Sequence, residues 1–467
     1  MFVGREKELN KLSEMYASNK FEFAVIYGRR RIGKTTLITE FCKQKKAIYF
    51  MAREANENIN LQNFSADVFN VTDPKSVNAL TINSWETAFD YIYRKAQDER
   101  LVLVIDEFPY LAESYKPISS ILQAAIDHKF LNSKLFLILC GSSMSFMEYQ
   151  VLGYKSPLFG RRTAQFKIRP FSYFEALPFF KSASPEEKAI FYGITGGIPE
   201  YMVKINSAIS PSKNIINLYL TDSGHLFEEP GNLIKQELRE PSTYNGIIEA
   251  IACGASKLNE IATKTGMESN KCAKYLTSLM TLGIVKKDIP ITEDSSKRSI
   301  YLLTDQMFRF WYRFVFSNMS LIISNKGESL YYHKIEPQLN SYMGLVFEEI
   351  CKDYLMLDDV FSSSPFFYGK IGRWWGTNPL KKRQEEIDIM AYDGNSAIFG
   401  ECKWINSLVN MDVLHDLMEQ GNMFSYSNKW YYLFAKNGFS DELKAYAKTD
   451  AHITLITFDE MNARDCL

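Results

Sequence analysis

The sequence of 467 residues predicts an α/β fold, in which helices cover both faces of a mostly parallel sheet. Two observations predict it: short apolar stretches alternate with helix-like ones, and glycine-rich or acidic segments follow the ends of those stretches. A ligand is then expected beyond the carboxyl ends of the strands. The expected strands are residues 24–28, 47–51, 101–105, 135–140 and 165–169, with a helix at 35–43.

The segment FEFAVIYGRRRIGKTT at residues 21–36 predicts a phosphate-binding loop between a strand and a helix. Glycine lets the backbone turn successive N–H groups toward one anion, and the helix adds the positive end of its dipole. Lys34 is expected to reach the β- and γ-phosphates of ATP, and the Thr35 hydroxyl to hold Mg²⁺. The arginines of the loop suit phosphate or nucleic acid, or simply face water. The predicted nucleotide-binding residues are Gly28, Arg29, Arg30, Arg31, Ile32, Gly33, Lys34, Thr35 and Thr36.

The segment LVLVIDE at residues 101–107 predicts a strand that is buried on both faces and ends in two carboxylates. Such carboxylates are costly to bury without partners. Asp106 is expected to hold the hydrated Mg²⁺, and Glu107 to orient or deprotonate the attacking water. The alternative is a strand that ends at a solvated acidic turn. The loop at 28–35 favours the ATPase interpretation.

Two later segments offer further candidates for the nucleotide site. The strand at 135–140 ends in Gly-Ser-Ser, so Ser143 or Ser142 is positioned to sense the γ-phosphate, although either serine could equally cap the next helix. Arg161 and Arg162 follow, and one of them is expected to reach a nucleotide in a neighbouring subunit of a homo-oligomer. The alternative is a pair of solvated surface arginines.

Composition limits the possible classes of protein. The chain is 46% hydrophobic and 23% charged, which is ordinary for a folded soluble protein, and its length suggests about three domains. No apolar stretch is long enough to span a bilayer, so no membrane partner is expected. Scattered cysteines and the lack of a signal sequence predict a cytoplasmic protein. The net charge of −1 means that any contact with DNA comes from local patches.

These motifs occur in an order that resembles the archaeal-type AAA+ ATPases, a clade related to the STAND signalling ATPases. The carrying segments are FVGRE at the start, GRRRIGKT, LVLVIDEF, the GSS turn, LFGRR and TGGIP at 195–199. The resemblance implies that Phe2, Val3, Gly4 and Arg5 lie beside the adenine, and that Pro199 belongs to a helical lid near the nucleotide. No second-sensor arginine follows Pro199, which leaves the coupling of the lid to ATP open.

Residues 243–305 have the order of a winged helix, with helices at 244–252, 258–263 and 269–282 and a hairpin around the turn Glu293-Asp294-Ser295-Ser296. Residues 257–298 carry eight basic and five acidic residues, so the net charge is +3. That charge supports modest contact with phosphates. The alternative is a module that docks proteins or spaces two domains. The aromatic stretch at 304–315 is interpreted as a buried joining helix; base stacking is the alternative.

The last third of the chain contains a second set of carboxylates. A hairpin is expected from strands at 385–391 and 396–403 around an Asp-Gly-Asn turn, which places Asp388 near Glu401 and Lys403. Glu401 and Lys403 are two residues apart and so face the same side of a strand. Two carboxylates can bind Mg²⁺ or Mn²⁺, and a lysine can activate water. The alternative is a structural salt bridge between Glu401 and Lys403.

This arrangement resembles the PD-(D/E)XK nuclease superfamily, although Ile387 stands where the motif has proline. The resemblance implies a helical acidic residue from 344–355, for which Glu349 is chosen over Glu348, and a later helix at 411–424 that carries Gln420. A second metal ion, Mg²⁺ or Mn²⁺, is then expected on Glu349, Asp388 and Glu401.

The sequence therefore predicts an α/β P-loop NTPase with a helical lid, a winged helix and a C-terminal PD-(D/E)XK-like domain. The expected segments are 1–169, 170–238, 239–305, 306–335 and 336–467. The predicted activity is hydrolysis of ATP, coupled to action on DNA at the C-terminal site. The alternative is a nucleotide-switched scaffold whose C-terminal domain binds nucleic acid or a protein partner without cutting.

Overall fold

The structure is a computed structural model that describes residues 2–76, 81–295, 298–378 and 381–463. The predicted wing turn includes Ser296, which lies outside the described residues. The chain divides into two compact units, each with its own core. Unit 1 comprises Met1–Pro170 and Ile198–Glu200, and unit 2 comprises Phe171–Gly197 and Tyr201–Leu467.

Unit 1 is built on a five-stranded sheet in the order β2-β3-β4-β1-β5. Every pairing in it is parallel, as expected for strands that alternate with helices. The three central strands are buried along their length, and nearly all of their residues are apolar, because helices cover both of their faces. The strands are β1 (Glu22–Tyr27), β2 (Ala47–Met51), β3 (Leu101–Asp106), β4 (Leu135–Gly141) and β5 (Ala164–Lys167).

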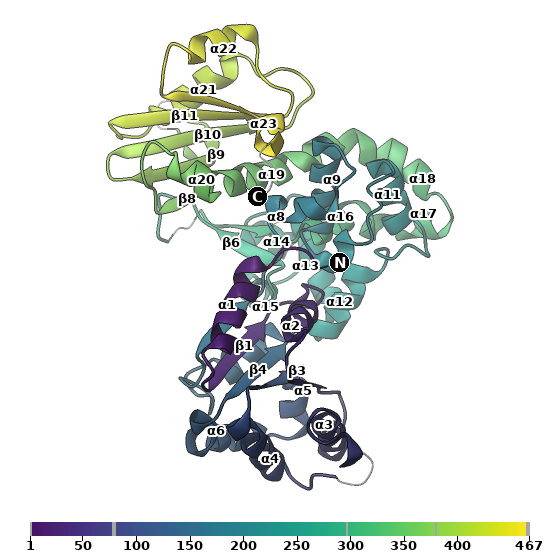
Figure 1. The fold of residues 1–467 in the computed structure, drawn as a ribbon. Coiled ribbons are helices and arrows are strands. Elements are labelled where there is room, and N and C mark those ends of the chain that lie inside the picture. Colours follow the sequence, from purple (N-terminus) through teal and green to yellow (C-terminus); the bar gives the residue numbers. More distant parts are fainter. Residues whose placement is uncertain (1, 77–80, 296–297, 379–380, 464–467) are drawn as a thin grey trace. The chain divides into compact units, whose positions relative to one another are not determined.

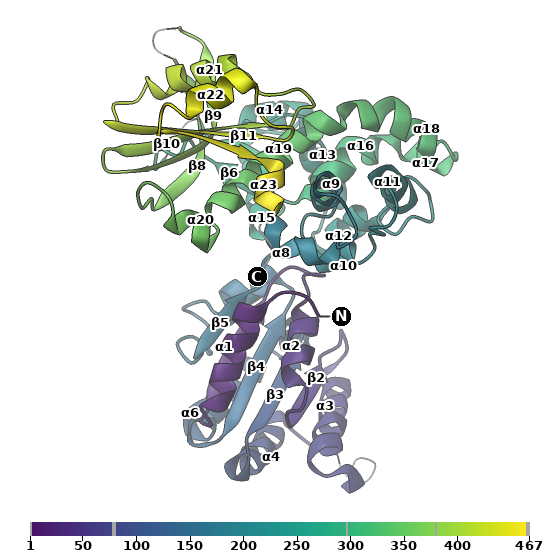
Figure 2. The ribbon, with the colours of Figure 1, turned by 45° about the horizontal axis from the view of Figure 1, so that its top comes forward.

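Helices cover the two faces of this sheet unequally (Figures 1 and 2). Helices α1 (Glu6–Ala17) and α2 (Lys34–Cys42) pack on one face, where Leu12 and Leu37 are buried. The larger core lies on the other face and includes Trp85. The helices there are α3 (Glu57–Thr72), α4 (Trp85–Asp98), α5 (Phe108–Ser114) and α6 (Ile118–His128), and the short α7 (Met144–Phe146) follows β4.

Unit 2 begins with the helices of the predicted lid. They are α8 (Tyr173–Ala176), α9 (Pro185–Thr195), α11 (Pro211–Tyr219) and α12 (Glu229–Glu237), while α10 (Pro199–Met202) starts in unit 1. Helix α9 ends at Gly196, and both Gly196 and Gly197 have positive φ. A Cβ on Gly197 would lie 2.1 Å from the carbonyl oxygen of Phe171, so only glycine fits there.

Three helices and a hairpin follow, in the order expected from the sequence. The helices are α13 (Pro241–Ala252), α14 (Leu258–Thr265) and α15 (Ser269–Thr281), and β6 (Val285–Asp288) pairs antiparallel with β7 (Ile300–Leu303). Helix α15 buries Cys272, Leu276 and Leu279 and leaves Lys271 and Lys274 exposed.

The aromatic stretch forms α16 (Gln306–Phe314), and nearly all of its side chains are buried. The indole N–H of Trp311 donates to the carbonyl of Phe227 at 2.6 Å. The Tyr342 hydroxyl donates to the carbonyls of Gly193 and Gln306, at 2.6 and 2.9 Å, and joins α9, α16 and α19. These contacts fit the interpretation as a buried joining helix and leave no aromatic faces free for bases. The short helices α17 (Met319–Ile323) and α18 (Gly327–Leu330) follow.

Unit 2 ends in a second five-stranded sheet, in the order β12-β11-β10-β9-β8. Strands β8 to β10 form an antiparallel meander, and β11 and β12 continue parallel to β10. Helix α19 lies on one side of this sheet, and α21 and α22 lie on the other (Figure 1). The elements are α19 (Glu336–Leu355), α20 (Asp358–Ser362), β8 (Lys370–Thr377), β9 (Gln384–Asp393), β10 (Ser396–Lys403), α21 (Met411–Gly421), β11 (Asn428–Ala435), α22 (Asp441–Ala447), β12 (Ile453–Thr457) and α23 (Phe458–Ala463).

Candidate functional site

The predicted phosphate-binding loop leaves β1 at Tyr27 and enters α2 at Lys34. Two of its residues, Arg31 at φ 68° and Gly33 at φ 88°, have left-handed backbone angles. Such angles turn consecutive N–H groups toward one side and form a concavity for anions. Gly28 is also required, because a Cβ there would lie 2.5 Å from the carbonyl oxygen of Ile168, just beyond β5.

Lys34 is buried inside this loop, where its ammonium group makes hydrogen bonds with the loop itself. It donates to the carbonyl of Gly28 at 2.9 Å and to that of Arg29 at 3.1 Å. A buried lysine needs such partners because an isolated charge is costly to desolvate. The same ammonium group is therefore held at the mouth of the concavity.

Asp106 lies buried at the end of β3, and three groups bind its carboxylate. Thr35 Oγ1 donates to Oδ2 at 3.2 Å, the Tyr49 hydroxyl donates to the same oxygen at 2.6 Å, and the backbone N–H of Glu107 donates to Oδ1 at 2.9 Å. Burial and the charge of Asp106 raise the pKa of Tyr49 well above its ordinary value, so this hydroxyl keeps its proton. The Thr35 and Asp106 oxygens are hard ligands at adjacent positions and fit Mg²⁺.

Glu107 turns toward the neighbouring strand. Its Oε2 accepts hydrogen bonds from the backbone N–H and the hydroxyl of Ser142, at 3.1 and 2.9 Å. The backbone of Glu107 is left-handed, at φ 51°, which redirects the chain between β3 and α5. Ser143 instead precedes α7, and its side chain makes no capping hydrogen bond. Of the two serines that the sequence offers, Ser143 and Ser142, it is Ser142 that contacts the predicted base.

The other predicted arginines lie in two places. Arg161 makes a bidentate ion pair with Asp127, at 2.7 and 2.6 Å, which lowers the pKa of Asp127. Arg161 and Arg162 precede β5, whose Ala164 pairs with Ala24 of β1, so both arginines lie at the amino end of the sheet. The phosphate-binding loop lies at the opposite, carboxyl end. Arg30, within the loop, donates to the hydroxyl of Tyr110 at 2.8 Å.

The segment of Phe2, Val3, Gly4 and Arg5 is attached to the chain that follows β5. Arg5 donates to the carbonyl of Arg169 at 2.5 Å, and Phe2 packs against the core under α1 and α2. A hollow of about 310 Å³ adjoins it, lined by Lys7, Glu8, Phe166, Lys167 and Ile168. Pro199 lies at the other side of the loop, where a Cβ on Gly33 would meet its Cγ at 3.6 Å.

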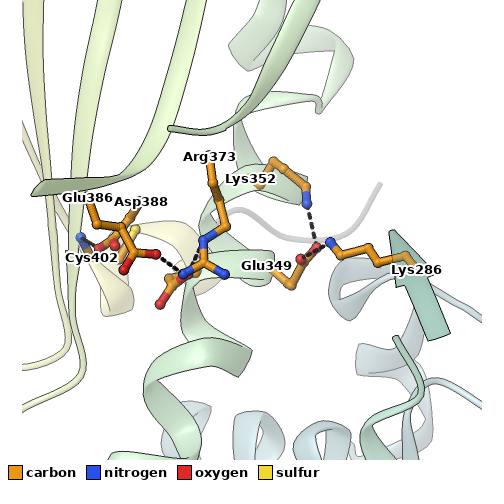
Figure 3. Close-up of polar contacts among 8 residues, drawn as sticks. Lys286, Glu349, Lys352, Arg373, Glu386, Asp388 and Cys402 are labelled. Carbon is orange, nitrogen blue, oxygen red and sulfur yellow. Dashed lines mark hydrogen bonds and ion pairs between the residues drawn. The ribbon is translucent and has the colours of Figure 1, made fainter. Parts of the chain in front are cut away.

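A second group of charged side chains lies in unit 2, and we define the carboxylate cluster as Glu348, Glu386, Asp388 and Glu401. Arg373 of β8 lies near Glu386 and Asp388 (Figure 3). Its guanidinium pairs with Glu348 at 3.4 Å and with Glu386. Burial and the charge of Asp388 raise the pKa of Glu348 to about 8. Burial and Asp388 likewise raise the pKa of Glu401 to about 7. The positive charge of Arg373 thus offsets the negative charge of these carboxylates only in part.

Glu349 faces a different set of partners from its neighbour Glu348. It forms ion pairs with Lys286 of β6 at 3.0 Å and with Lys352 at 2.5 Å (Figure 3). Burial by itself would raise its pKa, but Lys352 and Lys286 together lower the pKa of Glu349 to about 2. The helical carboxylate that lies with Asp388 is therefore Glu348, and the choice of Glu349 as a metal ligand does not match this geometry.

Asp388, Glu401 and Lys403 are held by short contacts within the sheet. Asp388 Oδ2 accepts from the backbone N–H of Cys402 at 2.9 Å, and Lys403 Nζ lies 2.5 Å from Glu401 Oε1. Among residues 2–76, 81–295, 298–378 and 381–463, no three His, Cys, Asp or Glu side chains are gathered closely enough to hold a metal ion. As its side chains lie, the cluster is only partly neutralised by Arg373 and does not fit a second cation.

Comparisons with known proteins match this architecture. An uncharacterized protein of Methanocaldococcus jannaschii is 37% identical over 410 residues, which cover 86% of this chain and 88% of that protein. A family model described as an ATPase domain predominantly from Archaea matches residues 2–205. The chain belongs to this archaeal ATPase family. Residues 311–414 match a second model, described as Archaea bacterial proteins of unknown function.

Two further similarities agree with membership of the archaeal ATPase family. An uncharacterized ATP-binding protein of Methanocaldococcus jannaschii is 48% identical over 46 residues, 10% of this chain and 78% of that protein. The structure of a Walker-type ATPase of Pyrococcus abyssi is 18% identical, covers 67% of this chain and 96% of its own, and has a TM-score of 0.51. These findings confirm the predicted archaeal-type ATPase domain and its P-loop fold. In the described part of the chain, no helix is both long and apolar enough to cross a membrane.

Three residues of these sites, Tyr49, Arg373 and Glu386, were not among the candidates that the sequence offered. Tyr49 lies in a strand that was predicted correctly, but nothing in the local pattern shows that its hydroxyl reaches the adjacent strand. Buried and partly exposed residues alternate along β2, and a partly buried tyrosine in such a strand needs a hydrogen-bond partner for its hydroxyl. This was the weak signal that the sequence offered. Arg373 lies in the segment KIGRWWG, whose strand character the analysis did not use.

Proposed function

We propose that this archaeal-type ATPase hydrolyses ATP with Mg²⁺ between the loop at 28–35 and the acidic end of β3. The observation that supports this proposal is the 3.2 Å contact between Thr35 Oγ1 and Asp106 Oδ2. It joins the end of the phosphate-binding loop to the acidic end of β3. Mg²⁺, when bound to these oxygens, neutralises charge on the phosphates.

The residues of the loop then act on the phosphates directly. The N–H groups around Gly33 and the start of α2 bind the phosphate oxygens. Lys34 exchanges its two carbonyl partners for phosphate oxygens, which are stronger acceptors because they are charged. Glu107 orients the attacking water and accepts its proton, and Ser142 sets the direction of the Glu107 carboxylate. Arg162, which unlike Arg161 is not committed to Asp127, is the better candidate for action in a neighbouring subunit.

The adenine is assigned to the hollow beside Phe2 to Arg5. That hollow adjoins the end of β5 and the next residue, Ile168, which approaches Gly28, so a nucleotide with phosphates in the loop can reach it. Pro199, next to Gly33, would then be placed to respond to an occupied loop.

Three variants test the ATPase proposal. Lys34→Ala should abolish ATP binding, whereas Lys43→Ala, at the exposed end of the same helix region, should leave it unchanged. Glu107→Gln should keep ATP binding and lose phosphate release. Ser142→Ala should lower turnover more than it weakens ATP binding. Normal phosphate release by Glu107→Gln would overturn the assignment of the base.

For unit 2, we propose a nuclease-like domain that acts on DNA. The supporting observation is the order of α19, β8, β9, β10, α21 and β11, with Glu348, Asp388, Glu401 and Lys403 contributed by three of these elements. The helices α13 to α15 and their hairpin add exposed Lys271 and Lys274, which suit contact with phosphates.

Incubation with duplex and single-stranded DNA, with and without Mn²⁺, tests this second proposal. Cleavage that disappears in Asp388→Ala supports a nuclease. DNA binding without cleavage under all conditions supports the nucleotide-switched scaffold instead. Coupling between the two units predicts that the Lys34→Ala variant cleaves at a rate different from that of the wild type with ATP, and equal rates would remove the coupling.

A further inference from the structure

Arg30, in the middle of the phosphate-binding loop, extends toward the acidic end of β3. Its guanidinium donates to the hydroxyl of Tyr110 at 2.8 Å. Tyr110 lies in the first turn of α5, where its backbone N–H donates to the carbonyl of Glu107 at 3.0 Å. The arginine of the loop therefore contacts the same helical turn that begins at the predicted catalytic carboxylate.

The order of the strands shows what this contact spans. Arg30 follows β1, Tyr110 follows β3, and β4 lies between these two strands in the sheet. The first turn of α5 packs closely on the end of β4, because a Cβ on Gly141 would lie 2.8 Å from Cδ of Pro109. The hydrogen bond from Arg30 to Tyr110 therefore bridges the carboxyl end of the sheet, on the side of Glu107.

In the proposed ATPase, the γ-phosphate occupies this same place. Lys34 lies at the mouth of the loop, and the contact between Thr35 and Asp106 brings two hard oxygens together beside it. Glu107 directs the attacking water from the end of β3. Arg30, which bridges from the loop to the turn of Glu107, is a further cation at the position of the reacting phosphate.

Tyr110 is a neutral partner for a charged side chain. A hydrogen bond from a guanidinium to a charged oxygen is about twice as strong as one to a neutral oxygen. A guanidinium can also make two parallel hydrogen bonds to one phosphate, which a tyrosine hydroxyl does not allow. The phosphate oxygens of ATP are therefore better acceptors for Arg30 than the hydroxyl of Tyr110.

We propose that Arg30 is a catalytic residue that exchanges Tyr110 for the oxygens of the γ-phosphoryl group during hydrolysis. This inference rests on the proposed ATPase function. The water oxygen attacks the γ-phosphorus, Glu107 accepts the proton of that water, and the electron pair of the broken bond stays on the β-phosphate of ADP. Arg30 forms no covalent bond and transfers no proton, because a guanidinium does not deprotonate in proteins. It stabilises the charge on the phosphoryl oxygens in the transition state.

Arg161 and Arg162 do not supply this charge within one chain. Both precede β5 and lie at the amino end of the sheet, opposite the loop. Arg161 is also paired with Asp127 at 2.6 Å. Arg30 lies at the carboxyl end instead, so it acts on the nucleotide of its own chain, whatever Arg162 contributes to a neighbouring one.

Two variants separate catalysis by Arg30 from a structural tie between the loop and α5. Arg30→Ala should lower kcat for phosphate release at least about 100-fold, because its contact is stronger in the transition state than with bound ATP. KM for ATP should change much less. Tyr110→Phe removes the same hydrogen bond from the other side and should keep kcat. An equal loss of kcat in the two variants would show a structural tie and overturn the inference.

Binding of a transition-state analogue gives a readout that does not depend on turnover. Fluorescent ADP alone should bind to Arg30→Ala about as tightly as to the wild type. With aluminium fluoride present, the wild type should hold this ADP more tightly, and Arg30→Ala should lose most of that gain. Arg30→Lys keeps the charge without the two parallel hydrogen bonds and should recover only part of it. Arg94→Ala, which removes an exposed arginine of α4, is the matched control and should match the wild type.

The outcomes separate this inference from the ATPase proposal. If Arg30→Ala releases phosphate and traps ADP with aluminium fluoride as well as the wild type does, the role of Arg30 is overturned and the ATPase function stands. A wild type that releases no phosphate overturns both. If Arg30→Ala fails to fold, Arg30→Lys and Tyr110→Phe decide: a loss of kcat in Arg30→Lys alone supports the inference, and equal rates in both variants overturn it.

Discussion

Replacement of Tyr49 by phenylalanine is a direct test of how Asp106 is held. The substitution keeps the aromatic ring in β2 and removes only the hydroxyl that donates to Asp106 Oδ2 at 2.6 Å. Thr35 and the N–H of Glu107 remain as partners of the carboxylate. The variant should therefore fold, with an Asp106 side chain that is less firmly directed toward the Mg²⁺ position.

The size of the effect follows from the charge of the acceptor. A hydrogen bond to a charged group contributes about 1.5–3 kcal/mol, and 1.4 kcal/mol corresponds to about a factor of 10 in an equilibrium constant. If most of this energy orients Asp106, the Mg²⁺ concentration that gives half-maximal ATPase activity should rise roughly tenfold. Turnover at saturating Mg²⁺ should change much less, because Glu107 and Ser142 are untouched.

The assay is ATPase activity across a Mg²⁺ titration at fixed ATP, for the wild type, Tyr49→Phe and Tyr27→Phe. Tyr27 is a buried tyrosine at the end of the central strand β1 and serves as the matched control. A Mg²⁺ titration of Tyr49→Phe that superimposes on that of the wild type would refute the positioning role of this hydroxyl.

Three further outcomes are expected. Gly28→Ala should destroy ATP binding, measured by fluorescent nucleotide titration, because its Cβ would meet the backbone of Ile168, whereas Gly344→Ala meets nothing within 4 Å and should be neutral. Burial raises the pKa of Asp67 from 3.8 to about 6. The folded state then binds more protons than the unfolded state between these values, so the free energy of unfolding should fall as pH rises from 3.8 to about 6, and Asp67→Asn should flatten that part of the urea-unfolding profile. Trp311→Ala should lower the free energy of unfolding by about 3–5 kcal/mol without changing the DNA affinity of the folded protein, since the side chain is buried; weaker DNA binding at unchanged stability would restore the base-stacking alternative.

Local patterns predicted the parallel sheet and the loop because each is encoded in a continuous segment. The glycines of the loop follow directly on the run that forms β1, and the acidic residues follow directly on the apolar run of β3. The sequence did not show which of the adjacent residues Glu348 and Glu349 faces Asp388. Successive helical residues are rotated by about 100°, so Glu348 and Glu349 both flank the apolar side of α19, and only packing decides which one meets the sheet.

Contacts between strands were beyond the reach of a single sequence. The hydrogen bond of Tyr49 to Asp106 joins two strands, and that of Ser142 to Glu107 joins the residues that follow two strands; both pairs are far apart in the sequence. Arg373 reaches the carboxylates because β8 pairs with β9, and no local pattern specifies that pairing. The sequence therefore identified the motifs, while the groups that orient them required the tertiary structure.

The hydrogen bonds of Tyr342, which join α9, α16 and α19, matter for the design of shorter fragments of this protein. The Tyr342 hydroxyl ties Gly193 to Gln306 from within α19, so a stretch that the ATPase family model includes is part of the same core as the segment of unknown function. A fragment cut after residue 205 would strip α9 of the helices that enclose it and expose apolar surface. A cut near Pro170 would also divide unit 1, because Ile198–Glu200 belongs to it, so the protein is best expressed and mutated as one full chain.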